Sequence, residues 1–452
     1  MRPKDVTGIR LPRWLKRHAP APPGLYYYRG RGKFRGMTLQ LRIEPDGKAV
    51  LAINAKTVLY LNETAATHVY YFMQGMPTQN AVKQVRSAYR VGEKTATEDH
   101  ERIIYTISTL AQTEEICPIS YLGVEKIEPF TQELSAPIRM DLALTFRCQN
   151  ECLHCYTGGP RETEEMNTAS WKRVLDKMKE LGIFIATFTG GEPTLRDDLP
   201  ELIAHAQKIG IVTGLVTNGR RLKEKEFLAN LERAGLDFAQ VTLESNNPDI
   251  HDKMTDSKGS WQETVEGIRN LIPTTIYTTT NTTLTKLNSA SFLETLDFLH
   301  SMGVRAFGCN ALIHSGRGPS FAEENALEPN ELKSILTKIR EKAAHLGMTF
   351  LWYTPTRYCE LNPVNLGLGV KSCTASGMNM CISPSGDAYP CQSYFQSLGK
   401  FLETDWNAIW NHPLSKQLRA RAYAPEDCED CPDLSTCGAG CPLELRDETP
   451  GS

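Results

Sequence analysis

The sequence lacks any apolar stretch long enough to cross a lipid bilayer, and its first residues lack the apolar core and cleavage site of a secretory signal peptide. It also lacks a strong excess of charge: the formal net charge is −3 over 452 residues. No low-complexity tract is present, and no internal repeat beyond an alternation of strands and helices. These absences argue against a membrane partner and against nucleic-acid binding through a basic surface. They predict a cytoplasmic protein.

Cysteine is abundant, and its placement is uneven. Of 13 cysteines, three lie at 148–155 and eight between 359 and 441, whereas Cys117 and Cys309 stand apart. An odd number fits poorly with a set of disulfides, and a reducing cytosol disfavours them. The clusters are therefore interpreted as metal ligands, and Cys117 and Cys309 as packing residues.

The region 24–110 is expected to form a small α+β domain of winged-helix type. Strands are predicted at 37–43, 49–53 and 57–61, and helices at 65–74, from residue 78, and at 97–110. Asp46-Gly47 predicts a turn, and Asn62 or Thr64 the first helix cap. Residues 111–137 contain three prolines and predict a linker with an edge strand near 119–124.

From residue 138 to 346, strand and helix patterns alternate. Strands are predicted at 138–145, 184–189, 211–216, 238–243, 276–282 and 304–311, and helices at 170–181, 198–209, 223–234, 261–271, 290–302 and 329–346. Repeated βα units indicate a parallel sheet covered by helices. Six units are fewer than the eight of a closed barrel, so a partial (β/α)6 TIM barrel is expected, with ligands at the carboxyl ends of the strands. Residues 347–452, rich in Cys, Gly and Pro, are expected to form an iron–sulfur domain stabilised by bound clusters.

The first cysteine group has the spacing C-x3-C-x2-C: Cys148, Cys152 and Cys155 directly follow the first strand of the alternating region. Three thiolates on one loop can bind three irons of a cubane cluster, which leaves the fourth iron open to a small molecule. A zinc site usually has four ligands, and no fourth Cys or His lies at a natural distance.

This loop resembles that of the radical S-adenosylmethionine (SAM) superfamily. The second strand ends in Thr189-Gly-Gly-Glu-Pro193, similar to the family's motif for the methionyl end of SAM, where Glu192 can pair with an ammonium. His154 stands where the family commonly has an aromatic residue beside the adenine. The resemblance implies that SAM is bound by His154, Gly190, Gly191, Glu192, Pro193, Asn218, Thr242 and Glu244. Asn218, Thr242, Glu244 and Asn281, at later strand tips, can equally be cap or turn residues.

The second cysteine set resembles the SPASM extension of radical SAM peptide maturases, which binds auxiliary 4Fe–4S clusters. Cys373 is followed by Gly386-x4-Cys391, and then by Cys428-x2-Cys431-x5-Cys437-x3-Cys441. The resemblance implies a first auxiliary cluster on Cys373, Cys391 and Cys441, with Cys359 a candidate fourth ligand, and a second on Cys428, Cys431 and Cys437. The family's last cysteine is missing. An open iron, Glu444, Asp447 or another chain are alternatives for that position, and a structural zinc knuckle remains an alternative for the group. Cys381 is off the pattern and is interpreted as a buried free cysteine.

The amino-terminal region resembles the peptide-binding (PqqD-like) chaperone of pyrroloquinoline quinone biosynthesis, most closely at Leu61-Asn-Glu-Thr64. The same fold is fused to enzymes that modify ribosomal peptides. A winged-helix domain that packs on the barrel or binds DNA is the alternative interpretation.

Together the resemblances imply a peptide maturase. Its reduced SAM cluster would pass an electron into SAM, and the resulting 5′-deoxyadenosyl radical would take a hydrogen atom from a precursor peptide. A crosslink, thioether or epimerisation would follow, and a flavodoxin or ferredoxin would supply electrons. The alternatives are maturation of an enzyme subunit or of a haem- or quinone-type cofactor, and a non-catalytic iron–sulfur electron carrier. No catalytic base stands out.

Overall fold

The computed structural model describes residues 21–30, 32–34, 37–54, 57–112 and 134–446. The chain divides into two compact units, residues 1–127 and 128–452, and each is described by itself. Most of the predicted linker, its expected edge strand, Cys117 and Asp447 lie outside the described residues. Within the described ranges, no helix is both long enough and apolar enough to cross a membrane.

The amino-terminal unit is an antiparallel sheet followed by three helices. Its elements are β1 (Gly24–Arg29), a 3-10 turn (Gly32–Phe34), β2 (Thr38–Ile43), β3 (Ala49–Ile53), β4 (Thr57–Leu61), α1 (Glu63–Met73), α2 (Thr78–Ala88) and α3 (Glu93–Gln112). The strands lie in the order β1-β2-β3-β4. The predicted strands 49–53 and 57–61 are confirmed, whereas β1 was not predicted.

Local sequence explains how this unit begins and turns. Gly47 has a φ of 90°, which suits glycine, and it closes the turn between β2 and β3. The Asn62 side chain accepts a hydrogen bond from the Ala65 amide (2.9 Å) and so caps α1. The unit has a core of its own, in which Leu41 and Leu51 of the sheet pack with Val69 of α1 and Ile107 of α3.

The second unit is built on one sheet, whose order is β11-β10-β9-β8-β7-β6-β5-β12-β13. Its strands are β5 (Arg139–Thr145), β6 (Ile185–Gly190), β7 (Val212–Thr217), β8 (Phe238–Thr242), β9 (Tyr277–Thr283), β10 (Ala306–Asn310), β11 (Thr349–Trp352), β12 (Asn379–Ile382) and β13 (Ala388–Tyr389). Its helices are α5 (Thr168–Glu180), α6 (Leu199–Ile209), α7 (Lys225–Ala234), α8 (Pro248–Thr255), α9 (Ser260–Leu271), α10 (Phe292–Ser301), α11 (Gly318–Asn325), α12 (Pro329–Leu346), α13 (Trp406–Trp410), α14 (Pro413–Arg419), α15 (Leu434–Cys437) and α16 (Pro442–Arg446), with short 3-10 turns at Pro193–Leu195, Arg220–Lys223, Ser289–Ser291 and Glu426–Cys428.

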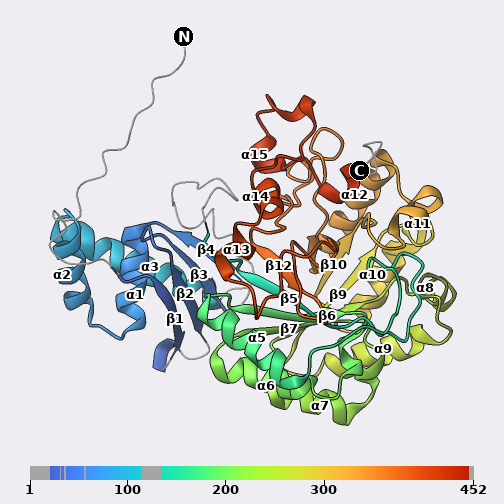
Figure 1. Cartoon of the computed structure of the whole chain (residues 1–452), viewed down its shortest axis with the longest axis horizontal. Helices are drawn as coiled ribbons and strands as arrows, with labels where there is room; N and C mark the ends of the chain where they lie inside the picture. The colour runs from blue at the N-terminus through green and yellow to red at the C-terminus, as the bar shows by residue number, and fades with distance from the viewer. Residues whose placement is uncertain (1–20, 31, 35–36, 55–56, 113–133, 447–452) are drawn as a thin grey trace. The chain divides into compact units, whose positions relative to one another are not determined.

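Strands β5 to β10 run parallel and lie side by side in chain order, as the alternation predicted. Figure 1 shows helices α5, α6, α7 and α9 along one face of these strands. Trp171 of α5 and Leu202 of α6 are fully buried against sheet residues such as Phe188. Parallel strands connected by helices place all their carboxyl ends at one edge of the sheet, and this arrangement positions the site.

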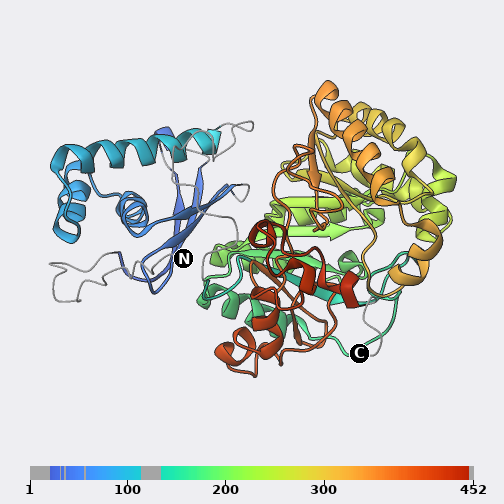
Figure 2. The same ribbon diagram turned by 90° about the horizontal axis from the view of Figure 1, so that it is seen from above.

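The carboxyl-terminal residues join the same sheet. β12 pairs in parallel with β5, matching Met380 with Met140 and Ile382 with Leu142, and all four side chains lie in one core. Long-range strand pairing thus continues the sheet across residue 346, and the domain boundary expected there stays a prediction. Figure 2 shows the orange-to-red residues that follow β11 gathered mostly in short helices and loops.

Candidate active site

The first cysteine loop begins where β5 ends. Every residue of β5 except Arg139 is buried, and the chain turns after Thr145 into the loop that bears Cys148, Cys152 and Cys155. The backbone amides of Glu151 and Leu153 donate to the Thr255 and Met254 carbonyls of α8 (3.0 Å each). This short helix, not predicted from the sequence, holds the middle of the loop.

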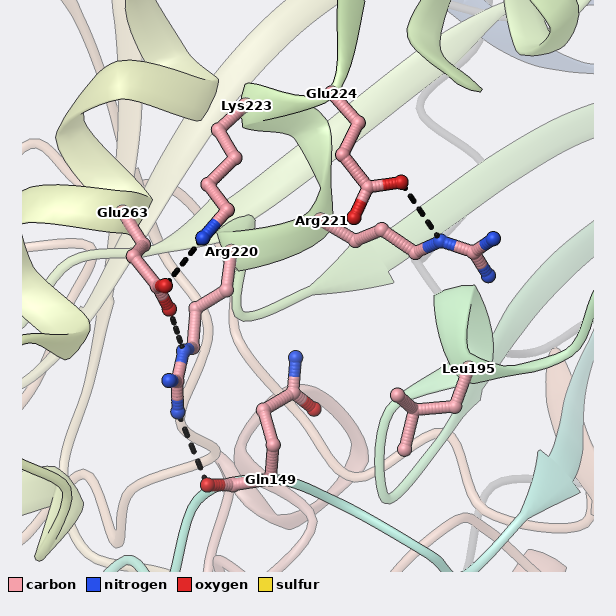
Figure 3. Close-up of a pocket in the computed structure, with 7 residues that line it drawn as sticks. All are labelled: Gln149, Leu195, Arg220, Arg221, Lys223, Glu224 and Glu263. Carbon is pink, nitrogen blue, oxygen red and sulfur yellow. Dashed lines mark hydrogen bonds and ion pairs between the residues drawn. The ribbon is translucent and has the colours of Figure 1, made fainter. Parts of the chain in front are cut away.

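Two arginines, which sequence reasoning missed, fix the same loop. Arg220 donates to the Gln149 carbonyl (3.0 Å) and the Asn150 side chain (2.7 Å), and it pairs with Glu263. Figure 3 shows the contacts of Arg220 with Gln149 and Glu263, in a pocket that is also lined by Arg221 and Lys223.

Arg317 holds the other end of the loop. Its side chain donates to the Glu151 carbonyl (2.7 Å), and its backbone amide donates to the Cys155 carbonyl (2.9 Å). Guanidinium groups suit this task because they offer several fixed donors at once.

The three thiols of the loop converge. Burial raises the pKa of Cys148 to about 12, and the neighbouring Glu192 carboxylate raises it further. Burial also raises the pKa of Cys152 well above its usual value, and the Cys148 and Cys155 thiols add to this. Thiolates in this site therefore require compensating positive charge, which iron would supply.

The three thiols are donors of the kind that bind the irons of a cluster. In the described part of the chain, no three His, Cys, Asp or Glu side chains come close enough together to hold one metal ion. Thiolates of a cubane bind different irons and stand farther apart than the ligands of one zinc. The three cysteines therefore fit the cluster that the sequence predicted.

The glycine pair at the end of β6 lies against this loop. The Gly191 amide donates to the Thr145 carbonyl, and the Glu192 amide to the Arg147 carbonyl (2.8 Å each). A Cβ on Gly190 or Gly191 would collide with the Thr145 or Arg147 carbonyl oxygen, and Gly190 has a φ of 127°. Only glycine permits this close approach of the turn to the cysteine loop.

Glu192 is fully buried, and its carboxylate is occupied by donors of the protein itself. One oxygen accepts from the Thr194 amide (3.0 Å) and from the Thr194 and Thr217 hydroxyls (2.6 and 2.7 Å), and the other accepts from the Asn218 amide (2.8 Å). Burial raises the pKa of this carboxyl, and these hydrogen bonds oppose the rise. The side chain thus joins the tips of β6 and β7. Its predicted pairing with an ammonium stays a prediction.

Asn218 and Glu244 bring two further strand tips to the loop. The Asn218 amide group donates to the Cys148 sulfur (3.8 Å). Glu244 accepts from the Thr283 amide (3.0 Å) and lies 3.1 Å from Nε2 of His154. The His154 ring also lies 5.9 Å from the Phe321 ring of α11, a neighbour that the sequence did not reveal.

Thr242 is half-buried at the end of β8, beside Asn281 in the ladder. Its neighbour Val241 faces the core, so Thr242 points to the opposite face of the sheet. Asn281 donates to the Asn310 side chain (2.7 Å). The role of Thr242 at SAM stays a prediction.

The later cysteines form two groups. Cys373, Cys391 and Cys441 are close to one another: burial raises the pKa of the Cys391 thiol, and the other two thiols add to this. Arg421 donates to the Cys373 carbonyl (2.7 Å). In the other group, burial raises the pKa of the Cys428 thiol, and the thiols of Cys359, Cys431 and Cys437 raise it further.

Two cysteines lie in apolar surroundings. Cys381 is buried in β12 and packs with Ala143 and Phe146, and Cys309 is fully buried in β10 within the main core. These positions agree with packing roles.

Comparison with known proteins agrees with this geometry. Residues 142–299 match the model of the radical SAM superfamily, and residues 373–432 match that of an iron–sulfur cluster-binding domain. The protein is a radical SAM enzyme. Its cofactors are SAM and 4Fe–4S clusters, as the sequence predicted.

Individual relatives match this radical SAM enzyme over much of its length. It is 27% identical to the PqqA peptide cyclase of Xanthomonas campestris over 68% of this chain and 82% of that protein, and 26% identical to the one from Gluconobacter oxydans over 68% and 86%. The crystal structure of Streptococcus suis SuiB bound to the precursor peptide SuiA has a similar fold (TM-score 0.67, 16% identity, 90% of this chain and 95% of that chain). The anSMEcpe structure with AdoMet and the Cp18Cys peptide is also similar (TM-score 0.53, 16% identity, 70% and 92%).

Proposed function

We propose that this radical SAM enzyme modifies a ribosomally made precursor peptide. The observation that carries the proposal is the close junction between the cysteine loop and the Gly190–Pro193 turn, which we interpret as a SAM site rather than a simple electron-carrier site. Support for a peptide substrate comes from the PqqA peptide cyclases and from SuiB with its bound precursor. The bond that is made, whether crosslink, thioether or epimerised centre, belongs to the same proposal.

The proposal assigns a task to each region. Residues 24–110 act as a PqqD-like recognition domain, 111–137 as a linker, 138–346 as a partial barrel and 347–452 as the auxiliary cluster domain. The order β1-β2-β3-β4 leaves β1 and β4 as the edges of the first sheet, and an extended leader can add a strand to such an edge. An electron donor of flavodoxin or ferredoxin type and a cytoplasmic location complete the proposal.

The protein's own residues create the conditions for the reaction. Cys148, Cys152 and Cys155 would hold the cluster, which together with SAM would supply radical chemistry for removing a hydrogen atom from the substrate. Arg220 and Arg317 hold the cysteine loop rigid, and Glu192 fixes the tips of β6 and β7 beside it. Glu192 and Glu244 are almost completely buried, so these two carboxylates are shielded from water.

The test is release of 5′-deoxyadenosine from SAM by anaerobically reconstituted, dithionite-reduced protein. The Cys148→Ala/Cys152→Ala/Cys155→Ala variant serves as control, and a candidate precursor from a neighbouring gene is followed by mass spectrometry. We expect product and a mass change in the peptide with the parent protein only. Full iron loading with neither SAM binding nor product would contradict the proposal.

A further inference from the structure

Cys359 lies between β11 and β12, 14 residues before Cys373. The family resemblance made it a candidate fourth ligand at the site of Cys373, Cys391 and Cys441, and left the site of Cys428, Cys431 and Cys437 one cysteine short. The structure gives Cys359 different neighbours.

The turn that leads to Cys359 surrounds the Cys437 sulfur. The Tyr358 amide donates to this sulfur (3.3 Å), and the Cys437 thiol donates to the Thr356 carbonyl (3.7 Å). A Cβ on Gly440 would lie 3.4 Å from the Arg357 amide nitrogen. Residues 356–358 therefore pack directly on residues 437–440, and this contact brings Cys359 to the Cys437 site.

Successive turns gather the other three cysteines. The Cys431 amide donates to the Cys428 carbonyl (3.1 Å), and the Cys437 amide to the Asp433 carbonyl (2.7 Å). Cys428, Cys431 and Cys437 therefore lie on successive turns, and the contact between residues 356–358 and 437–440 adds Cys359 to them.

We propose that Cys359, Cys428, Cys431 and Cys437 together bind one auxiliary 4Fe–4S cluster. Cys359 thus takes the place of the family's missing last cysteine. Four thiolates complete the coordination of one cubane, whereas Cys373, Cys391 and Cys441 supply three ligands to the other cluster. The inference concerns cofactor ligation and does not depend on which substrate is modified.

Anaerobic alkylation of the holoenzyme by iodoacetamide, read by peptide mass spectrometry, tests the grouping. Cys359 is exposed, so only a bound iron should protect it. We expect full protection in the parent, and full alkylation of Cys359 in the Cys428→Ala/Cys431→Ala/Cys437→Ala variant. The matched Cys373→Ala/Cys391→Ala/Cys441→Ala variant should keep Cys359 protected. The reverse pattern overturns the proposal.

A single substitution provides a second test, which does not depend on correct folding of the triple variants. In Cys359→Ser, an oxygen ligand replaces sulfur, and the electron paramagnetic resonance signal of one auxiliary cluster should change. The same signal should be lost in the Cys428→Ala/Cys431→Ala/Cys437→Ala variant, which should contain about four fewer irons per chain. An unchanged spectrum in Cys359→Ser, or zinc in place of iron at this site, overturns the assignment.

Discussion

At the scale of single residues, the site depends on buried polar groups whose partners come from different strands. Glu192 accepts two backbone amides and two hydroxyls from residues 194, 217 and 218. A buried carboxylate is stable only when such donors replace water. The Glu192 carboxylate can only accept hydrogen bonds, and by accepting them from both strand ends it holds the tips of β6 and β7 in position next to Cys148.

Replacing Glu192 by glutamine tests this role. Each carboxylate oxygen accepts a backbone amide, so either orientation of the Gln side chain would place an N–H group against another N–H group. A mismatch of this kind costs about 1–3 kcal/mol, so we expect SAM affinity, measured by equilibrium dialysis of reconstituted protein, to fall roughly 5- to 150-fold. The control is Glu162→Gln, because Glu162 is exposed and lies in the loop that follows Cys155. Equal affinity of the two variants would contradict the role assigned to Glu192.

At the scale of secondary-structure elements, a histidine pair joins two helices of the amino-terminal unit. Nδ1 of His68 in α1 lies 3.1 Å from Nδ1 of His100 in α3, and both residues are buried. Burial lowers the pKa of His68 to about 4, and the neighbouring His100 lowers it further. Burial also lowers the pKa of His100. One ring must stay neutral to accept the hydrogen bond.

The pair predicts that acid loosens the packing of α1 on α3. The unfolded state, with a histidine pKa near 6.5, binds more protons than the folded state, so stability is complete above that value. It is lost as pH falls from about 6.5 towards 4. His68 alone would account for on the order of 2 kcal/mol at pH 5.

Hydrogen exchange at pH 7 and pH 5, corrected for intrinsic rates, measures this loss. Peptides from α1 and α3 should lose protection, whereas peptides from α6 serve as the control because His205 there lies against Asp176 (2.8 Å). Equal protection of α1 and α3 at the two pH values would rule out the predicted effect.

At the scale of the whole molecule, two compact units have separate hydrophobic cores. One core joins Leu41 and Val69, and the other runs from Met140 through Phe188 to Ile409. Each core is formed by residues of its own unit, so one unit does not need the other to bury its apolar side chains.

Deleting residues 1–127 should therefore leave the second unit folded and able to release 5′-deoxyadenosine from SAM with dithionite. Binding of the precursor, measured by fluorescence anisotropy, should be lost if the first unit holds the leader. The full chain with Glu162→Gln is the folded control. Retained peptide affinity in the truncated chain would refute the recognition role, and loss of its thermal transition would refute the independence of the two cores.

Much of the fold could be predicted because its signals are local. Helix α12 begins and ends at Pro329 and Leu346 as predicted, and α1 is capped by Asn62, one of the two predicted candidates. Strands β12 and β13 were missed because they are short, and β12 finds its partner β5 about 240 residues earlier in the chain. No local periodicity encodes a pairing of that length.

The sequence alone determined the chemistry of the site, since thiol spacing and a glycine pair after consecutive strands limit which cofactors can bind. Only the tertiary structure decided which groups of the protein contact these site residues. It brought Arg220 and Arg317 into contact with the cysteine loop, and it placed hydrogen-bond donors of the protein around the Glu192 carboxylate. It also placed the Tyr358 amide, next to Cys359 in the chain, on the Cys437 sulfur. Spacing is a property of one segment, whereas these contacts join segments that meet only when the chain folds.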